Sequence, residues 1–517
     1  MNSLEPTDRR RWAALGALCT SLVVVTIDNT ILNTAIPTLA RELSATTVDL
    51  QWINNAYTLA FAALLITAGG LGARFGHRRI LLTGLTLFAL GSAFAALSHT
   101  SLQLIGWRTV MGATAALVMP ATLSLVVSMF APHERGRAIG IWSATAGLGI
   151  AIGPVAGGVL LEHFSWGSVF WINVPLVAGV IAATVLLVPS ARGITKGSFD
   201  IPGLLLSAGG LALMVDALTQ ASIRGWSSPI TLLEIVSATA LLAGFVWWEL
   251  RAPAPMTDVR IFTSRVFSIS NAILAATFFA LFGVLFTYTQ YLQFVRGYGP
   301  LIAGVGAVPF AIVMAAVASS SDRVVGRLGV RWSIASGLAV MAVGLLVLSI
   351  AADRYAPFGI LAAIMALVGA GMGLVMAPAT TASMSSVAPQ QAPMASSINS
   401  VVRELGGVLG VAVVGTVVAT VFRSRFGPGV DTAAVDTSTA DLAQIHASAP
   451  PASALTDAAN QAYTSAMSTG IQICAAVAFV GALAVIALFP SPRRRASCPP
   501  ADPANSDGEG VRLPSNP

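Results

Sequence analysis

Apolar residues recur along the whole chain in stretches of about 20, separated by short segments rich in Gly, Pro or charged residues. A helix of about 20 apolar residues crosses the hydrocarbon core of a bilayer, because each residue advances the helix by about 1.5 Å. The pattern therefore predicts an all-α polytopic membrane protein with fourteen spans. These spans are residues 13–36, 50–72, 80–98, 102–127, 137–160, 168–189, 201–219, 229–248, 267–289, 301–319, 332–351, 357–379, 396–421 and 470–490.

The basic residues are unevenly shared among the segments that connect the spans. Most of the 28 Lys and Arg residues fall in every second segment, such as Arg9–Arg11, Arg74–Arg79 and Arg323–Arg331. Cytoplasmic loops carry the excess of Lys and Arg in membrane proteins. We therefore expect a multi-pass protein of the cell inner (plasma) membrane with both termini in the cytoplasm.

The motif R-x-G-x-R occurs twice, at Arg74–Arg78 after the second span and at Arg327–Arg331 after the tenth. The copies occupy equivalent places in two six-span halves if spans seven and eight are an insertion. Parallel repeats of this kind are typical of transporters in which two bundles rock around a central site. The predicted division is a cytoplasmic N-terminus at 1–12, a first bundle at 13–190, two inserted helices at 200–250, a second bundle at 265–490 with an outer loop at 422–468, and a disordered cytoplasmic tail at 491–517.

Composition excludes several classes of function. With 55% hydrophobic and 10% charged residues and a mean hydropathy of +0.79, the chain is no soluble enzyme or nucleic-acid-binding protein. The three cysteines and five histidines are scattered, so they predict no metal site. The lone lysine, Lys196, lies in ITKGS, outside any phosphate-binding loop, which argues against an ATP-driven pump.

The first span carries polar residues in the run TIDNTILNTAIP. On a helix, Asp28, Asn29 and Asn33 point at about 0°, 100° and 140°, so they form one polar arc. A carboxyl within the bilayer is retained only where it faces protein or water. We therefore expect this arc to line a water-filled cavity between the two halves, where it could exchange protons or attract a cationic or amphipathic substrate.

Ionisable residues on three other spans are of interest. Arg108, on the fourth span, lies at a depth comparable to that of Asp28, so the two could pair; a purely structural ion pair is the alternative. Arg403 and Glu404 open the thirteenth span near the membrane midplane, where Arg403 is either the counter-charge of its neighbour or part of a functional pair. Asp216, near the outer end of an inserted helix, is expected to have a structural role.

Glycines gather in two segments together with Arg or Pro. The loop GGLGARFGHRR permits a tight turn, and its arginines can hold helix C-termini or simply anchor the cytoplasmic side. On the fifth span, GLGIAIGPVAGG predicts close helix packing and, through its proline, a bend where the two halves meet. The residues concerned are Gly69, Arg74, Gly76 and Arg78 in the loop, and Gly149, Gly153, Pro154, Gly157 and Gly158 in the span.

Taken together, these segments resemble the major facilitator superfamily, in particular its fourteen-helix drug:proton antiporters, over nearly the whole chain. IDNTILNTAIP resembles the first-helix motif, GGLGARFGHRR the loop motif, LIGWRTVMG the fourth-helix motif and GLGIAIGPVAGG the fifth-helix antiporter motif; WGSVFWINVP and RELGGVLG also resemble family segments. The chain departs from the family at Ala73 and Gly326, where the loop motif and its repeat usually have an acid, and at Met111, often a Gln. The charge-relay latch of the family therefore lacks its acid here.

The resemblance implies a proton-coupled antiporter that exports hydrophobic or cationic drugs or antibiotics across the bacterial inner membrane, a multidrug resistance function. It would be no enzyme, use no cofactor other than the proton motive force, bind no nucleic acid and work as a monomer in the lipid bilayer. We hypothesise that Asp28 and Glu404 bind protons or compete with substrate, and that Arg108 tunes Asp28. The alternatives are a dedicated exporter of one endogenous metabolite or antibiotic, for self-resistance, and an uncoupled facilitator.

Overall fold

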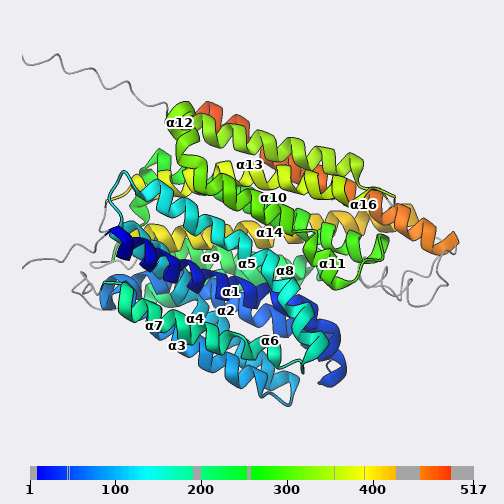
Figure 1. Ribbon diagram of the computed structural model, residues 1–517, viewed down its shortest axis with the longest axis horizontal. Coiled ribbons are helices and arrows are strands. Elements are labelled where there is room, and N and C mark those ends of the chain that lie inside the picture. Colours follow the sequence, from blue (N-terminus) through cyan, green and yellow to red (C-terminus); the bar gives the residue numbers. More distant parts are fainter. Residues whose placement is uncertain are drawn as a thin grey trace, which may run out of the picture.

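The structure of the protein, a computed structural model, describes residues 8–43, 45, 47–189, 200–252, 258–353, 355–388, 391–426 and 454–490. Every regular element in these ranges is a helix, and the long helices run roughly along one direction of the molecule (Figure 1). This arrangement confirms the all-α prediction. It also satisfies the backbone inside a bilayer, because each helix pairs its own N–H and C=O groups.

The helices fall into a first bundle, an inserted pair and a second bundle. The first bundle contains α1 (Asp8–Glu42), α2 (Thr47–Phe75), α3 (His77–Ala96), α4 (Ser101–Met129), α5 (Arg135–His163), α6 (Ser168–Trp171) and α7 (Asn173–Leu187). The inserted pair is α8 (Ile201–Arg224) and α9 (Pro229–Glu249). The second bundle contains η1 (Val259–Thr263), α10 (Arg265–Gln290), η2 (Tyr291–Val295), α11 (Pro300–Val305), α12 (Val308–Ala351), α13 (Phe358–Ser385), α14 (Ala392–Phe426) and α16 (Ala454–Leu488).

The number of passes follows from the described helices. Twelve segments are long and apolar enough to cross a membrane. One of them, Ile302–Ala351, is interrupted at Gly329 and so provides two passes. The 29-residue α5, whose charged residues lie near its ends, is not among the twelve but matches them in length. Counted in this way, the described helices provide the fourteen passes that the hydropathy pattern predicts.

The two copies of R-x-G-x-R adopt the same kind of turn. Their central glycines, Gly76 and Gly329, have φ of 92° and 78°, a backbone conformation that a Cβ disfavours. Each glycine reverses the chain between two consecutive spans, α2 and α3 in the first bundle and the two parts of α12 in the second. The sequence repeat is therefore a structural repeat.

The last arginine of each motif copy holds a helix end. Arg78 donates from Nη2 to the carbonyl oxygen of Val185 over 2.6 Å, in the last turn of α7. Arg331 donates to the carbonyl of Ile486, in the last turn of α16. Carbonyls at a helix C-terminus lack intrahelical partners and attract cations. For Arg78 this confirms that a loop arginine holds a helix C-terminus, and Arg331 makes the equivalent contact within the second bundle.

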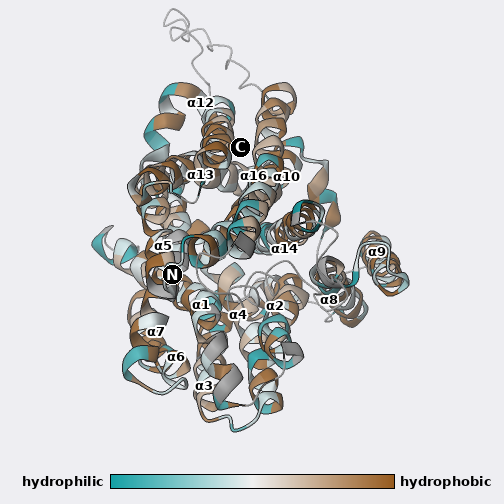
Figure 2. Ribbon diagram, turned by 90° about the vertical axis from the view of Figure 1, so that its right-hand side faces the viewer, coloured by the Kyte–Doolittle hydropathy of each residue, from teal (hydrophilic) through white to brown (hydrophobic). Residues whose placement is uncertain are grey.

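The inserted pair lies at the side of the molecule, where the two bundles meet (Figure 2). Helix α8 packs against α2 of the first bundle and α14 of the second, and α9 packs on α8. The Trp226 indole, between α8 and α9, donates to the hydroxyl of Thr416 on α14 over 2.9 Å. The pair therefore covers one side of the seam without entering either bundle.

The predicted outer loop at 422–468 is wrong at both edges. Helix α14 continues to Phe426 and α16 already begins at Ala454; residues 427–453 lie outside the described part, as do 1–7 and the predicted tail 491–517. The start of α16 has low hydropathy because it is rich in Ala, Ser and Thr, but its Ala459 and Tyr463 are fully buried. The Tyr463 hydroxyl donates to Gln290 over 2.9 Å. Packing of these buried residues thus extends the helix beyond the stretch that hydropathy predicts.

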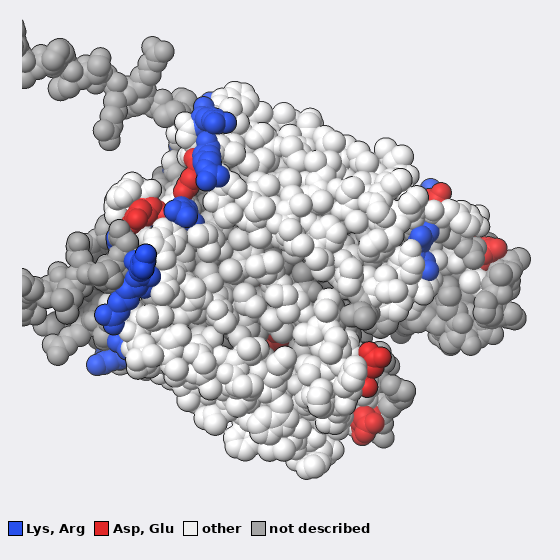
Figure 3. All heavy atoms as spheres, in the orientation of Figure 1, with Lys and Arg blue, Asp and Glu red and all other residues white. Residues whose placement is uncertain are grey.

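Charged side chains gather at the ends of the molecule. Figure 3 shows Lys and Arg in a band across one end, only a few at the other end, and a nearly uncharged surface between them. The first residues of α1 and the last residues of α16 both lie at the end with the basic band (Figure 1). This end is called the basic end below. The uncharged middle is the part of the surface that suits lipid.

Candidate functional site

Asp28 and Arg108 form an ion pair in the interior of the first bundle. Arg108 Nη1 lies 2.7 Å from Asp28 Oδ2, and both side chains are 0% exposed. Helix α1 supplies the carboxylate and α4 the guanidinium, so the pairing predicted from their similar depth is confirmed. A buried ion pair of this kind is stable only if further hydrogen bonds replace the lost water.

Neighbouring helices supply those hydrogen bonds. Asn173, at the start of α7, donates from Nδ2 to Asp28 Oδ1 over 2.8 Å and to the hydroxyl of Ser92 over 3.0 Å. Arg108 Nε donates to the carbonyl of Ile53 over 3.2 Å, and its guanidinium lies 4.2 Å from the centre of the Tyr57 ring. The network joins α1, α2, α3, α4 and α7. Sequence reasoning did not single out Asn173, although an Asn in the apolar run WINVP was the available signal.

The expectation that Asp28 lines a water-filled cavity is wrong in this structure. The carboxylate is fully enclosed, because Arg108 and Asn173 replace the water that a solvated carboxylate would need. Asn29, the next residue, is half-buried, and the side chain of Asn33 lies outside the described part. The Asp28 side of the predicted arc therefore faces the dry interior of the first bundle.

Glu404 occupies a different environment on α14. Its side chain is half-buried, and it has neither an ion pair nor a hydrogen bond among the described residues. The carboxyl lies close enough to Tyr57 of the first bundle to act on its hydroxyl electrostatically, as Asp28 and Arg108 also do. Glu404 is thus a partly accessible carboxyl beside the seam.

The glycines after Glu404 bring α14 against α10. A Cβ at Gly406 would lie 2.9 Å from Ala275 Cα, and one at Gly410 would lie 2.9 Å from Phe279 Cα. Real Cβ atoms essentially never come that close to backbone. Gly406 and Gly410 therefore bring α14 into close contact with α10.

Arg403 is not the counter-charge of Glu404. Its side chain is 2% exposed and donates from Nη2 to the hydroxyl of Thr380 on α13 over 2.8 Å. Its guanidinium also lies 5.1 Å from the Trp142 ring of α5 and 5.7 Å from the Phe278 ring of α10. Adjacent residues on a helix point about 100° apart, so the two charges face different surroundings.

The fifth-span glycines form a contact between α5 and α1. Three glycines spaced four residues apart on α5 face three threonines with the same spacing on α1. A Cβ added at any of these glycines would collide with its threonine; the pairs are Gly149 with Thr26, Gly153 with Thr30, and Gly157 with Thr34. The Thr30 hydroxyl also donates to the carbonyl of Gly149 over 3.4 Å. This confirms close packing. Gly158 is half-buried, the side chain of Pro154 lies outside the described part, and the bend at this proline stays a prediction.

Asp216 lies on the inserted helix α8, outside both bundles. It is half-buried and senses the charges of Glu234 and Arg224, which pair with each other over 3.0 Å. Among the described residues, no hydrogen bond or ion pair connects it with the Asp28 network or with Glu404. This surrounding agrees with the structural role expected for Asp216.

The two bundles touch at the basic end through α5 and α12. A Cβ at Gly136 would lie 2.9 Å from Asp322 Cγ, and one at Gly140 would lie 2.5 Å from the carbonyl oxygen of Ala318. Arg137 acts electrostatically on Asp322. Asp322 was not predicted, although it lies only five residues before the second R-x-G-x-R motif. Asp322 therefore places a carboxylate between the bundles at the basic end, although Ala73 and Gly326 occupy the positions that are usually acidic in the family.

A second contact at the basic end joins α14 to α2 and α4. A Cβ at Gly69 would lie 3.1 Å from the carbonyl oxygen of Pro393 and 3.0 Å from Ser397 Cβ. Ser396 donates from Oγ to the carbonyl of Pro120 over 2.9 Å. With the α5–α12 contact, these interactions close the seam at the basic end.

Gly140→Val is expected to open the basic end. The added methyl groups would collide with the α12 backbone, and overpacking costs about 1–3 kcal/mol, a shift of about 5- to 150-fold in an equilibrium. Ala144, one turn further along α5, packs against Ala318 and Ala377 behind this contact. In a background without Cys19, Cys474 and Cys498, a cysteine at position 144 should react at least about fivefold faster with a membrane-impermeant maleimide from the basic side.

The matched control is Gly179→Val, because a Cβ at Gly179 meets no atom within 4 Å. It should leave the labelling rate of the cysteine unchanged. An unchanged rate in Gly140→Val as well would show that this contact does not hold the basic end closed.

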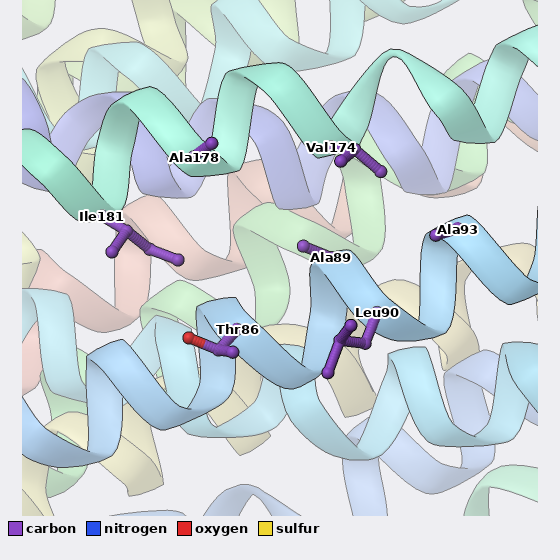
Figure 4. Close-up of a pocket in the computed structure, with 7 residues that line it drawn as sticks. All are labelled: Thr86, Ala89, Leu90, Ala93, Val174, Ala178 and Ile181. Carbon is purple, nitrogen blue, oxygen red and sulfur yellow. The ribbon is translucent and has the colours of Figure 1, made fainter.

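An apolar cavity of about 180 Å³ lies between α3 and α7 (Figure 4). It is lined by Thr86, Ala89, Leu90, Ala93, Val174, Ala178 and Ile181. Leu90 is 50% exposed, so the cavity opens on the outer surface of the first bundle. It is separate from the polar residues described above and suits contact with lipid.

The described residues contain no group of three His, Cys, Asp or Glu side chains arranged to hold a metal ion.

Comparison with known proteins places the chain in a family. The model of the Major Facilitator Superfamily matches residues 18–411. The chain is 34% identical to the multidrug resistance protein Stp of Mycobacterium tuberculosis (strain CDC 1551 / Oshkosh), over 83% of this chain and 80% of that protein. It is 33% identical to the tetracenomycin C resistance and export protein of Streptomyces glaucescens, over 97% and 96%.

Solved structures share the fold. The crystal structure of the human organic anion transporter MFSD10 superposes with a TM-score of 0.59 at 13% sequence identity, covering 93% of this chain and 100% of that chain. At this identity the likeness concerns the fold alone. With two bundles, a repeated basic turn and a family match over most of its length, the chain belongs to the Major Facilitator Superfamily.

Proposed function

We propose that the protein exports hydrophobic antimicrobial compounds in exchange for protons. Its relatives are named for multidrug resistance and for antibiotic resistance and export, and they match most of the chain. The observation that carries proton exchange is Glu404, a half-buried carboxyl within a span, beside the seam and with no partner in the described structure. Such a group can take up a proton when the seam is wet and release it after the bundles move.

Asp28 is less suited to carry the proton. Protonating it would break a 2.7 Å ion pair and leave Arg108 as an uncompensated charge in the bundle interior. The same network joins five helices of the first bundle. In our proposal the Asp28–Arg108 pair keeps the first bundle rigid, and Glu404 exchanges the proton.

The orientation follows from the basic end. Because cytoplasmic segments carry the excess of Lys and Arg, we place the basic end in the cytoplasm, together with both termini of an inner-membrane protein. The contacts at this end then close the cytoplasmic side of the seam. In this proposal the protein is a monomer that uses no cofactor other than the proton motive force, performs no chemical reaction and takes a small molecule and protons as its partners.

The test is transport by the purified protein in lipid vesicles. An imposed pH gradient should drive accumulation of a hydrophobic drug against its own concentration gradient, with protons moving the opposite way. Collapse of the gradient by a protonophore, and vesicles without protein, are the controls. Transport that only follows the drug gradient and ignores the pH gradient would instead identify an uncoupled facilitator.

A dedicated exporter is the second candidate. It is favoured by the relative that matches 97% of this chain, because that protein is named for resistance to and export of one antibiotic. Resistance of cells that express the protein, measured over a chemically varied drug panel, separates the two. Protection against a single structural class would favour the dedicated exporter, and protection against unrelated classes a multidrug exporter.

A further inference from the structure

Arg403 carries hydrogen-bond donors that nothing in the described structure satisfies. Its Nη2 donates to Thr380, but Nε and Nη1 are buried and have no partner among the described residues. A guanidinium has five N–H donors and is always charged. Leaving such donors buried and unpaired is costly, so a residue of this kind is expected where a ligand completes it.

Aromatic rings from both bundles surround the same guanidinium. Trp142 comes from α5 of the first bundle and Phe278 from α10 of the second, with ring centres at 5.1 and 5.7 Å from the guanidinium carbon. The Trp142 indole is held by a 3.2 Å hydrogen bond to the hydroxyl of Thr122 on α4. Movement of one bundle against the other would therefore separate the two rings and expose Arg403 between them.

We propose that Arg403, Trp142 and Phe278 form a subsite for planar aromatic substrates that carry an anionic oxygen. The rings can stack on the aromatic plane, and the free N–H donors of Arg403 can bind a carboxylate or phenolate oxygen. A buried positive charge repels an organic cation at this position. This inference rests on the proposed export function and names the substrate class of that site.

The same contacts also permit a simpler role, in which Arg403 only ties α14 to α5 through its interaction with Trp142. In that role the charge of Arg403 would affect the stability of the closed seam but would not select among ligands. A measurement of ligand preference at equilibrium separates the two roles. If Arg403 is only a structural tie, its replacement changes the affinity for charged and for neutral ligands by the same factor.

The experiment uses two probes of similar shape, anthraquinone-2-carboxylate and neutral 2-(hydroxymethyl)anthraquinone. Their Kd values for the purified full-length protein are measured by calorimetry. A charge-assisted hydrogen bond predicts that the wild type binds the carboxylate about tenfold more tightly or better. In Arg403→Gln the two Kd values should become equal, with that of the neutral probe within about threefold of wild type. Arg403→Lys keeps the charge but not the planar fork, so it should retain part of the preference.

The matched control is Arg260→Gln, the same change at an exposed arginine in η1. It should leave the preference at the wild-type value. Each variant is first shown to be monodisperse. If Arg403→Gln does not fold, Arg403→Lys should show a reduced preference for the carboxylate, and Trp142→Phe should weaken the binding of both probes. A preference that survives in Arg403→Gln, or a wild type that does not favour the carboxylate or binds neither probe, would overturn the subsite. If this binding test overturns the subsite but an imposed pH gradient still drives export of another drug, only the substrate class is wrong and the proposed function is retained.

Discussion

Replacing Glu404 by Gln is expected to abolish pH-driven export. The amide keeps the size of the side chain but cannot take up or release a proton, so a pH gradient can no longer be coupled to drug movement. The measurement is substrate-driven proton release in vesicles, followed with a trapped pH-sensitive dye. The signal should fall to that of vesicles without protein, while the Kd for the drug stays measurable.

Two variants make this result specific to Glu404. Glu404→Asp keeps an exchangeable carboxyl and should retain part of the coupling. Asp216→Asn removes the carboxyl from the inserted helix α8, which lies outside both bundles, and should leave proton release near the wild-type level. Wild-type proton release in Glu404→Gln would show that another group carries the proton and would remove the observation on which the proposed function rests.

Replacing Asp28 by Asn is expected to destabilise the first bundle severely. The change leaves the Arg108 guanidinium, which is 0% exposed, without its counter-charge and turns one carboxylate acceptor into an amide donor. Breaking a buried ion pair by removal of one partner costs about 3–5 kcal/mol. The expected result is a clear drop in the melting temperature of the protein in detergent and a lower yield of monodisperse material.

The control for this prediction replaces both partners. In Asp28→Leu with Arg108→Met no charge is left unpaired, so most of the lost stability should return. Asn29→Ala, at the half-buried neighbour on α1, should change the melting temperature by much less. A similar melting temperature for Asp28→Asn and wild type would mean that water reaches Asp28 and Arg108, and that the carboxylate is not committed to this pair.

Hydropathy and residue type were sufficient to predict the membrane-crossing helices. Spanning a bilayer demands about 20 apolar residues in a row, a local property that is readable without knowledge of the fold. Likewise, the R-x-G-x-R repeat predicted equivalent turns, because a positive φ at Gly76 and Gly329 is again a local property. The start of α16 was missed for the opposite reason: its small residues are buried only through packing with distant helices.

The environments of the charged residues were decided by tertiary structure. Asp28 contacts residues 80 and 145 positions away, and the second of these, Asn173, makes its site dry rather than wet. Arg403 and Glu404 are adjacent in the chain, yet one is enclosed by aromatic rings from two bundles and the other is partly accessible without a partner. The sequence reveals that a charge lies in the membrane and at what depth. Which groups surround that charge depends on how distant helices pack, and their arrangement determines whether the charge is buried in an ion pair, left free to exchange a proton or available to a ligand.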